Sequence, residues 1–229
     1  MRCPVCDSVM AGGYRVCKKC EDTLIRVREP RCMHCGKPIK AEVAEYCHDC
    51  AKQGRSNYIQ GLALWIYDKK ARQSLARFKY MGRREYVSYY AEEMVNGMGE
   101  LVSRWNADAL IPVPIHKKRL RKRGYNQAQL LAEEFGKRIG IPVISDYIVR
   151  IKDTKAQKDL SNRDRRSNLN KAFYLRKTQR ELCNSPRCAI IVDDIYTTGS
   201  TIEACAGVLL QAGVEEIYYI SLCIGQGIG

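Results

Sequence analysis

The chain has 229 residues, is 45% hydrophobic and carries a formal net charge of +14. This length suits one core-forming domain with a small additional module, and no stretch approaches the roughly 18 apolar residues that a membrane-spanning helix needs. The first residues also lack the apolar run of a signal peptide, so we expect a cytosolic protein whose thiols stay reduced.

Eight of the twelve cysteines fall within the first 50 residues, as four Cys-x-x-Cys pairs separated by ten or eleven residues. Each pair forms a turn that aims two thiolates at one point, and two such turns complete a tetrahedral four-cysteine zinc site. We therefore predict a module of residues 1–57 with two structural Zn²⁺ sites, followed by an α/β domain of residues 58–229. The eight predicted ligands are Cys3, Cys6, Cys17, Cys20, Cys32, Cys35, Cys47 and Cys50.

Other uses of these cysteines fit less well. Disulfide bonds would need an oxidising compartment, and redox Cys-x-x-Cys motifs occur singly, not four times in series. His34 and His48 lie beside predicted ligands, but the cysteines already complete both sites. The sequence leaves the pairing open, because the first pair can share its zinc with the second pair or, in a cross-brace, with the third.

The rest of the chain alternates strand and helix patterns with short connections, which predicts an α/β domain with a parallel sheet. Apolar residues recur every three or four positions in the helical stretches, and short apolar runs mark the strands. In chain order we expect a linker at 53–57, a strand at 61–67, a helix to Lys79, a helix at 85–105, a strand at 108–113, a helix at 125–139, a strand at 143–150, a loop or mobile hairpin at 151–170, a strand at 188–192, a helix at 200–212 and a strand at 216–224.

The most informative stretch runs from Ile190 to Thr201. An apolar strand leads into two acids, then into a loop of hydroxyl residues with one glycine, and then into a helix. Ligands of open parallel sheets bind at the carboxyl ends of strands, and helix N-termini favour anions. The acids suit ribose hydroxyls and, through water, Mg²⁺, whereas simple capping of the helix is the alternative. The predicted phosphoribosyl and Mg²⁺ residues are Asp193, Asp194, Thr197, Thr198, Gly199, Ser200 and Thr201.

This stretch resembles the phosphoribosyl-diphosphate (PRPP) signature of type I phosphoribosyltransferases. The resemblance implies a central sheet of about five parallel strands, a hood, a mobile loop over the site, and Mg²⁺-PRPP chemistry. Two further blocks resemble the ComF family of competence proteins, and the cysteine module fits the same family, so the resemblance covers essentially the whole chain. The blocks are Pro112-Val113-Pro114 continuing to Arg123-Gly124-Tyr125-Asn126-Gln127-Ala128, and Arg150 through Thr154, Gln157, Arg166 and Asn168 to Phe173.

Resemblance to the ComF family implies a role in natural transformation, alongside an ATP-driven helicase and single-strand DNA handling proteins. It places the protein in the cytoplasm, or at the inner face of the membrane through the uptake machinery. One block departs from active phosphoribosyltransferases, whose pyrophosphate loop is usually small and glycine-bearing. Here that loop is Val113-Pro114-Ile115-His116, which leaves enzymatic activity undecided.

Positive charge is concentrated between Lys117 and Arg180, where there are 19 Lys/Arg and 6 Asp/Glu. A basic rim around a phosphoribosyl pocket suits a polyanion threaded across it, so we expect single-stranded DNA as a partner. A merely solvated basic face is the alternative, and Tyr125 could equally belong to the core. The predicted nucleic-acid or phosphate contacts are Lys117, Lys118, Arg119, Arg121, Lys122, Arg123, Tyr125, Asn126, Gln127, Arg150, Gln157, Arg166 and Asn168.

Two functions therefore stay open on the sequence. A non-catalytic adaptor would bind single-stranded DNA and a phosphoribosyl ligand during DNA uptake, with the zinc module docking a partner. A true phosphoribosyltransferase would transfer phosphoribose from PRPP to a base, an amine or a nucleic-acid acceptor. The basic rim and the altered pyrophosphate loop favour the adaptor, whereas the acid pair and the hydroxyl-rich loop favour the enzyme.

Overall fold

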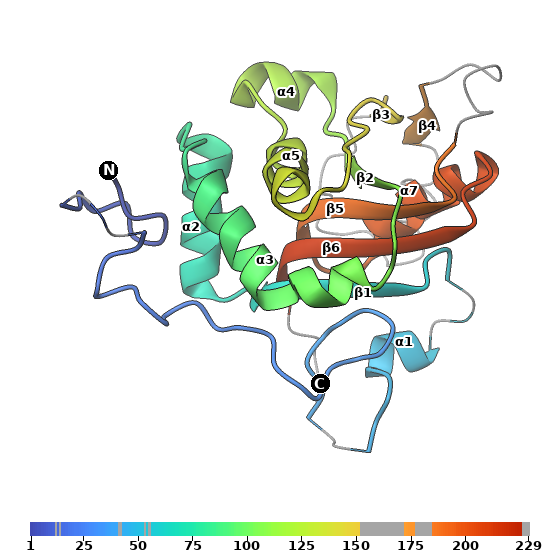
Figure 1. Ribbon diagram of the computed structural model, residues 1–229, viewed down its shortest axis with the longest axis horizontal. Coiled ribbons are helices and arrows are strands. Elements are labelled where there is room, and N and C mark those ends of the chain that lie inside the picture. Colours follow the sequence, from blue (N-terminus) through green and yellow to red (C-terminus); the bar gives the residue numbers. More distant parts are fainter. Residues whose placement is uncertain are drawn as a thin grey trace, which may run out of the picture.

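The computed structural model describes residues 1–11, 13, 15–40, 43–52, 54, 56–151, 172–176 and 185–225. Two cysteine-rich ribbons precede a domain of alternating strands and helices (Figure 1). Within the described residues, no helix is both long enough and apolar enough to cross a membrane.

A parallel sheet forms the centre of the molecule. Its strands are β1 (Gln60–Ile66), β2 (Ala109–Pro112), β5 (Cys188–Tyr196) and β6 (Glu216–Ile224), in the spatial order β1-β6-β5-β2. All neighbouring strands in this sheet run parallel, so their carboxyl ends meet at one edge. The first five residues of β5 are buried, as expected for an inner strand with a continuous apolar run.

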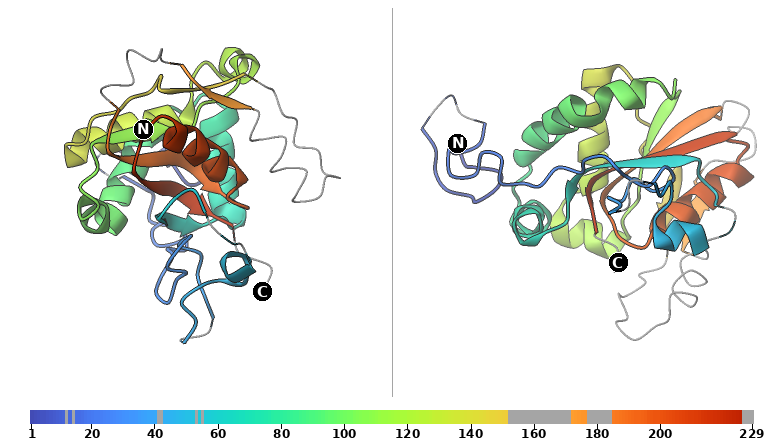
Figure 2. Two further views of the ribbon diagram at one scale, coloured as in Figure 1. Left: turned by 90° about the vertical axis from the view of Figure 1, so that its right-hand side faces the viewer. Right: turned by 90° about the horizontal axis from the view of Figure 1, so that it is seen from below.

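Helices cover both faces of this sheet (Figures 1 and 2). α2 (Lys69–Tyr80), α3 (Tyr86–Ser103) and α5 (Gln127–Ile139) share one apolar core with the sheet, and α7 (Ser200–Gln211) shares the other. In β5, successive residues point to opposite faces: Ile190 and Val192 enter the first core, and Ala189 and Ile191 enter the core that holds α7. The predicted fold class, a parallel α/β sheet with helices on both faces behind a zinc-binding module, is confirmed.

The two ribbons pack against opposite faces of the sheet. Apolar residues of the first ribbon (residues 1–24) belong to the core that holds α2 and α3. The second ribbon (residues 31–52), which ends in α1 (His48–Lys52), contributes to the core that holds α7. A single N-terminal module thus contacts both layers of helices.

The segment between the ribbons lies along β1, which is an edge strand of the sheet. The amide of Val27 donates to the carbonyl of Leu64 over 2.9 Å, and the amide of Ile66 donates to the carbonyl of Ile25 over 2.8 Å. Arg26 and Trp65 form an antiparallel bridge between these bonds. The backbone of β1 is therefore paired on both sides.

Three elements differ from the expectations. The basic block forms a helix, α4 (Lys117–Arg123), because its Lys and Arg residues have good helix propensity and Gly124 ends it at φ 79°. The strand expected at 143–150 is reduced to a parallel bridge between Val143 and Leu110. Its later residues form β3 (Ile148–Arg150), which pairs antiparallel with β4 (Phe173–Leu175). The predicted loop lies mostly outside the described residues.

Candidate functional site

The predicted phosphate loop lies between β5 and α7, at the carboxyl edge of the sheet. Gly199 caps the helix in the left-handed region, at φ 76°, and a β-carbon built there would lie 2.4 Å from the Tyr196 hydroxyl. Only glycine fits this position without displacing Tyr196. The first amides of α7 have no acceptor within the helix, and the Thr198 and Ser200 hydroxyls lie 3.0 Å apart beside them. These groups form a set of donors suited to a phosphate.

The acid pair belongs to β5 itself and not to a free strand end as expected, because the ladder with β6 continues through Asp193 to Tyr196. Asp193 is half-buried, and its Oδ1 accepts a hydrogen bond of 2.8 Å from the amide of Asp194. Burial first, and the neighbouring Asp194 carboxylate second, raise the pKa of Asp193 to about 7, against the opposing charge of Lys79.

Lys79 is a site residue that the sequence did not reveal. Its Nζ lies 2.9 Å from Oδ1 and 2.8 Å from Oδ2 of Asp194, and both side chains are largely buried, with 15% and 14% exposed. Burial lowers the pKa of this lysine, but the charge of Asp194 and its hydrogen bond outweigh that effect and raise it. Lys79 is one of several basic residues in α2, and nothing in the sequence distinguishes it from the others.

The carboxylates of Asp193 and Asp194 are only partly available as ligands for Mg²⁺. Both oxygens of Asp194 contact the Lys79 ammonium, so this carboxylate already has a cation beside it. Asp193 has one oxygen engaged by the Asp194 amide and a second one able to accept from a sugar hydroxyl. The geometry suits ribose hydroxyls well, and suits a metal mainly as the companion of a bound diphosphate.

The basic block continues from β2 and therefore starts at the same edge as the phosphate loop. Its helix α4 is capped by His116, whose Nδ1 accepts from the amide of Lys118 over 3.2 Å, so this histidine has a structural role. No residue of α4 is buried. Its most exposed basic side chains are Lys117, Lys118, Arg121 and Lys122.

Three predicted nucleic-acid contacts lie in the interior instead. Tyr125, Asn126 and Gln127 are only 6%, 9% and 1% exposed. The Tyr125 hydroxyl donates to the carbonyl of Phe78, and the Asn126 side chain donates to the carbonyl of Val113 over 3.0 Å while capping α5. These residues fix the position of α5 and are not available to a strand of DNA.

Arg150 ends β3, and its guanidinium lies 5.2 Å from the centre of the Phe173 ring. The other residues predicted from this block, Gln157, Arg166 and Asn168, lie outside the described residues.

Tyrosines connect the second ribbon to the phosphate loop. The Tyr219 hydroxyl donates to the carbonyl of Cys35 over 2.6 Å, and the Tyr219 ring stacks on Tyr196 with centroids 4.7 Å apart. The Tyr196 hydroxyl lies 3.0 Å from that of Tyr58 and, as described, directly against Gly199. The second ribbon therefore supports the turn that presents the phosphate donors.

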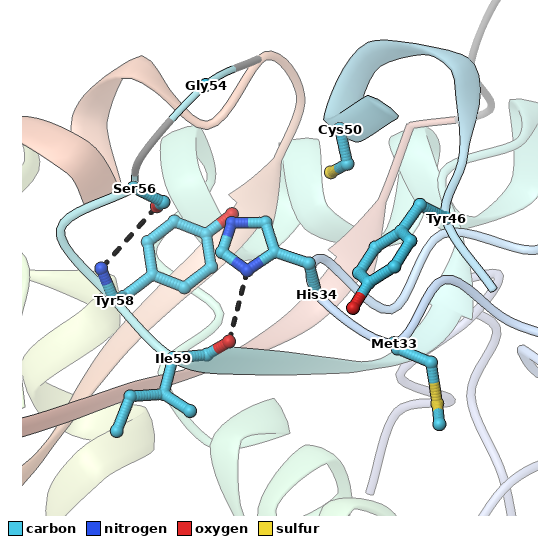
Figure 3. Close-up of a pocket in the computed structure, with 8 residues that line it drawn as sticks. All are labelled: Met33, His34, Tyr46, Cys50, Gly54, Ser56, Tyr58 and Ile59. Atoms are coloured by element: carbon cyan, nitrogen blue, oxygen red, sulfur yellow. Dashed lines mark hydrogen bonds between the residues drawn. The ribbon is translucent and has the colours of Figure 1, made fainter. Parts of the chain in front are cut away.

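A hollow of about 300 Å³ opens on the other side of Tyr58, within the second ribbon (Figure 3). His34 lies flat against the Tyr58 ring, with centroids 4.2 Å apart, and its Nδ1 lies 3.0 Å from the carbonyl oxygen of Ile59. The acid pair and the phosphate loop do not line this hollow. His34 packs the ribbon against β1 and takes no part in the cysteine clusters.

The first ribbon supports α2 in a similar way. The Ser74 hydroxyl donates to the carbonyl of Pro4 over 2.6 Å, and the Arg77 guanidinium donates to the carbonyl of Val5 over 2.8 Å. Arg83 and Tyr86 both bond the Asp7 carboxylate, which directly follows a cysteine of the first cluster. Because α2 carries Lys79, the two ribbons support the site from its two sides.

The eight N-terminal cysteines form two clusters, and within each cluster the four sulfurs lie within 4.8 Å of one another. Sulfur separations of 3.7 Å for Cys6–Cys17 and 3.6 Å for Cys35–Cys47 fit a tetrahedral zinc, whose bonds of about 2.3 Å place sulfurs about 3.8 Å apart. The first pair shares its cluster with the second pair, and the third with the fourth. A sequential arrangement therefore replaces the cross-brace alternative.

Fold and site together define a protein with two zinc ribbons and a parallel α/β domain whose phosphate-type loop follows an inner strand. Residues 1–51 match a family model described as a double zinc ribbon domain, which supports structural zinc in both clusters. The chain is 33% identical to Competence protein F of Haemophilus influenzae over 82% of both chains. It belongs to the ComF family of competence proteins.

Two further relatives span nearly the whole chain. Competence protein ComFC of Bacillus subtilis is 28% identical, over 92% of this chain and 89% of its own. DNA utilization protein YhgH of Salmonella typhimurium is 28% identical over 96% of each. Among solved structures, a purine phosphoribosyltransferase from Pyrococcus horikoshii is similar over 60% of this chain and 87% of its own, at 16% identity and a TM-score of 0.35.

Proposed function

We propose that this protein binds single-stranded DNA during DNA uptake and holds a phosphoribosyl ligand at the β5–α7 loop. The observation that carries the proposal is α4, a helix in which six of seven residues are basic and none is buried. It is linked to the acid pair through α2, whose Tyr80 contacts Arg123 and whose Lys79 contacts Asp194. Relatives named for competence and for DNA utilization support a role in handling DNA.

The position of the α4 charges beside an exposed aromatic side chain favours single-stranded DNA as the ligand. These charges lie on a short helix whose Arg123 contacts an aromatic side chain, Tyr80, and the DNA backbone supplies the matching negative charge. Because lysines and arginines that bind phosphates carry no base information, the binding has little sequence preference. The expected partners are a competence helicase and single-strand DNA handling proteins, in the cytoplasm or at the inner face of the membrane.

The β5–α7 loop supplies the second half of the proposal. The α7 amides and the hydroxyls of Thr198 and Ser200 bind the 5-phosphate, and Asp193 accepts from a ribose hydroxyl. Mg²⁺ accompanies the diphosphate when the ligand is PRPP. The acid pair and this loop also support the second candidate function, transfer of phosphoribose to a base, an amine or a DNA end.

The adaptor is the better supported of the two. The place of the pyrophosphate loop is taken by Val113 and Pro114, both buried, and by His116, which caps α4. This turn does not present a row of free glycine amides to a diphosphate. An assay for pyrophosphate release from PRPP in the presence of bases, amines and single-stranded DNA separates the two functions.

The DNA proposal is tested by removing the four most exposed charges of α4, with Lys117, Lys118, Arg121 and Lys122 changed to Ala. Anisotropy titrations with a fluorescent oligothymidine at several salt concentrations should show weaker binding, and a log–log salt slope reduced by about 0.7 for each phosphate that is no longer neutralised. The matched control removes four exposed lysines of the ribbons, Lys18, Lys19, Lys40 and Lys52, and should bind nearly as the parent protein does. Equally weakened binding in both variants would show an effect of net charge alone.

The pocket proposal is tested by calorimetry with PRPP and Mg²⁺. Asp193→Asn keeps the acceptor for the Asp194 amide but removes the charge that faces the sugar, so PRPP binding should weaken. Thr198→Ala removes a phosphate donor from an exposed position. Glu100→Gln, on the exposed surface of α3, serves as the charge-matched control. Unchanged PRPP affinity in both loop variants contradicts the pocket. A larger residue at Gly199 is no clean test, because it meets Tyr196 before it meets the ligand.

A further inference from the structure

An exposed aromatic side chain stands at the end of α2, next to the basic helix. Tyr80 is 65% exposed, although most tyrosines of the described chain are buried or half-buried. The guanidinium carbon of Arg123 lies 4.8 Å from the centre of the Tyr80 ring, and its Nη2 donates to the Tyr80 hydroxyl over 3.1 Å. A cation and a ring therefore form one composite surface between α2 and α4.

Contacts with neighbouring residues fix the positions of Arg123 and Tyr80. Arg123 also donates to the side-chain oxygen of Gln127 over 3.0 Å, and Gln127 is buried. The guanidinium is therefore anchored before any ligand arrives. Arg84 donates to the carbonyl of Gly124 over 3.1 Å, and the Tyr125 hydroxyl donates to Phe78, so the ends of α2 and α4 are fixed to each other.

The surface also lies close to the predicted pocket. Tyr80 directly follows Lys79, whose ammonium contacts the Asp194 carboxylate. Met81 and Leu120, the exposed apolar neighbours along the two helices, are 60% and 42% exposed. Around them lie the charges of α4. An aromatic face, an apolar border and a basic surround are the combination by which proteins hold unpaired bases and their phosphates together.

We propose that Tyr80 and Arg123 form a stacking site for one base of single-stranded nucleic acid, beside the phosphoribosyl pocket. The inference rests on the proposed DNA binding. It adds a subsite that distinguishes a strand with bases from a sugar-phosphate backbone without them. Charge alone attracts any polyanion, whereas an exposed ring adds affinity only for a ligand with a π face. The nearby α4 charges then bind the phosphates on either side of the stacked base.

The test compares two strands of equal length and charge: oligothymidine, and an abasic strand with the same sugar-phosphate backbone. In anisotropy titrations Tyr80→Ala should weaken oligothymidine binding by about tenfold, the usual range for one stacked base, and leave the abasic strand unchanged. Tyr80→Trp should keep oligothymidine binding, and its fluorescence should be quenched by oligothymidine but not by the abasic strand. Tyr46→Ala, at a tyrosine 49% exposed on the second ribbon, is the matched control and should bind as the parent does.

The outcomes separate this inference from the proposed function. Equal binding of both strands by the parent protein, with no effect of Tyr80→Ala, overturns the stacking site and leaves DNA binding intact. No binding of either strand by the parent overturns both proposals. Binding to vesicles rich in phosphatidylserine that disappears in Tyr80→Ala, without any change for oligothymidine, shows that the surface meets a membrane and also overturns the stacking site.

Discussion

At the scale of single residues, the site is organised by one buried ion pair. Lys79 places its ammonium on both oxygens of Asp194, while Asp193 on the same strand has its own bond to the Asp194 backbone. The two acids therefore have different environments, although they are neighbours in the sequence. Asp194 is balanced by a cation of the protein, and Asp193 is the acid that we propose binds the ligand.

Because of this difference, we expect substitutions of Asp193 and Asp194 to lower the free energy of unfolding by different amounts. Asp194→Asn leaves the Lys79 ammonium buried without its partner, and the free energy of unfolding should fall by about 3–5 kcal/mol, as for other broken buried pairs. Asp193→Asn keeps its hydrogen bond and should cost much less. Chemical denaturation of both variants measures the difference. Equal destabilisation would show that the ion pair does not form, and Lys79→Met combined with Asp194→Leu should recover much of the stability.

The pKa of Asp193 predicts a dependence of stability on pH in the ligand-free protein. The folded value, about 7, lies above the ordinary value of 3.8, so the folded state holds this proton more tightly than the unfolded state does. The stabilisation is complete below about pH 4 and is lost as the pH rises to about 7. Denaturation at several pH values should show this fall, and Asp193→Asn should flatten it. A parent protein whose stability rises across this window without a difference from the variant contradicts the assignment.

At the scale of elements, sequence periodicity predicted most helices and strands, because each has a single apolar face or a continuous apolar run. The basic block could be predicted as charged but not as a helix, since α4 has no apolar face and is fixed by its cap residues, His116 and Gly124. The contacts of Lys79 and the stacking role that we propose for Tyr80 could not be predicted from the sequence. Lys79 contacts Asp194, 115 residues away along the chain, and Tyr80 contacts Arg123, 43 residues away, so neither contact can be seen in the local sequence.

The two ribbons support different parts of the α/β domain, so we expect the loss of a zinc ligand to have different effects in each ribbon. Cys50→Ser should weaken the second cluster, whose backbone supports Tyr219 and hence the turn at Gly199, and PRPP binding should fall. Cys17→Ser should weaken the first cluster, which supports α2, and should reduce thermal stability with a smaller effect on the phosphate loop. Elemental analysis should give two zinc ions for each parent chain and one for each variant. PRPP affinity that falls equally in both variants contradicts separate roles.

At the scale of the whole molecule, the ribbons are part of the folded unit. The sequence places a boundary between residues 57 and 58, but a β-carbon at Gly36 of the second ribbon would lie 2.6 Å from the carbonyl oxygen of Gly61 in β1. Backbones that approach this closely leave no solvent layer between the module and the sheet. We therefore expect the isolated chain of residues 58–229 to melt at a markedly lower temperature than the whole protein, by differential scanning calorimetry. An equal melting temperature would show that the boundary separates independent domains.

The segment at residues 25–27 affects the tendency of the protein to associate with other chains. By pairing with β1 it occupies backbone donors and acceptors that an edge strand otherwise offers to other chains. A chain without this segment carries an apolar strand with one open side, which is a template for aggregation. Residues 58–229 alone should therefore form oligomers that grow with protein concentration, as measured by light scattering, whereas a chain that begins at residue 25 should stay monomeric even without the first zinc. We therefore expect the N-terminal module to limit self-association of the protein through residues 25–27, which bind no metal.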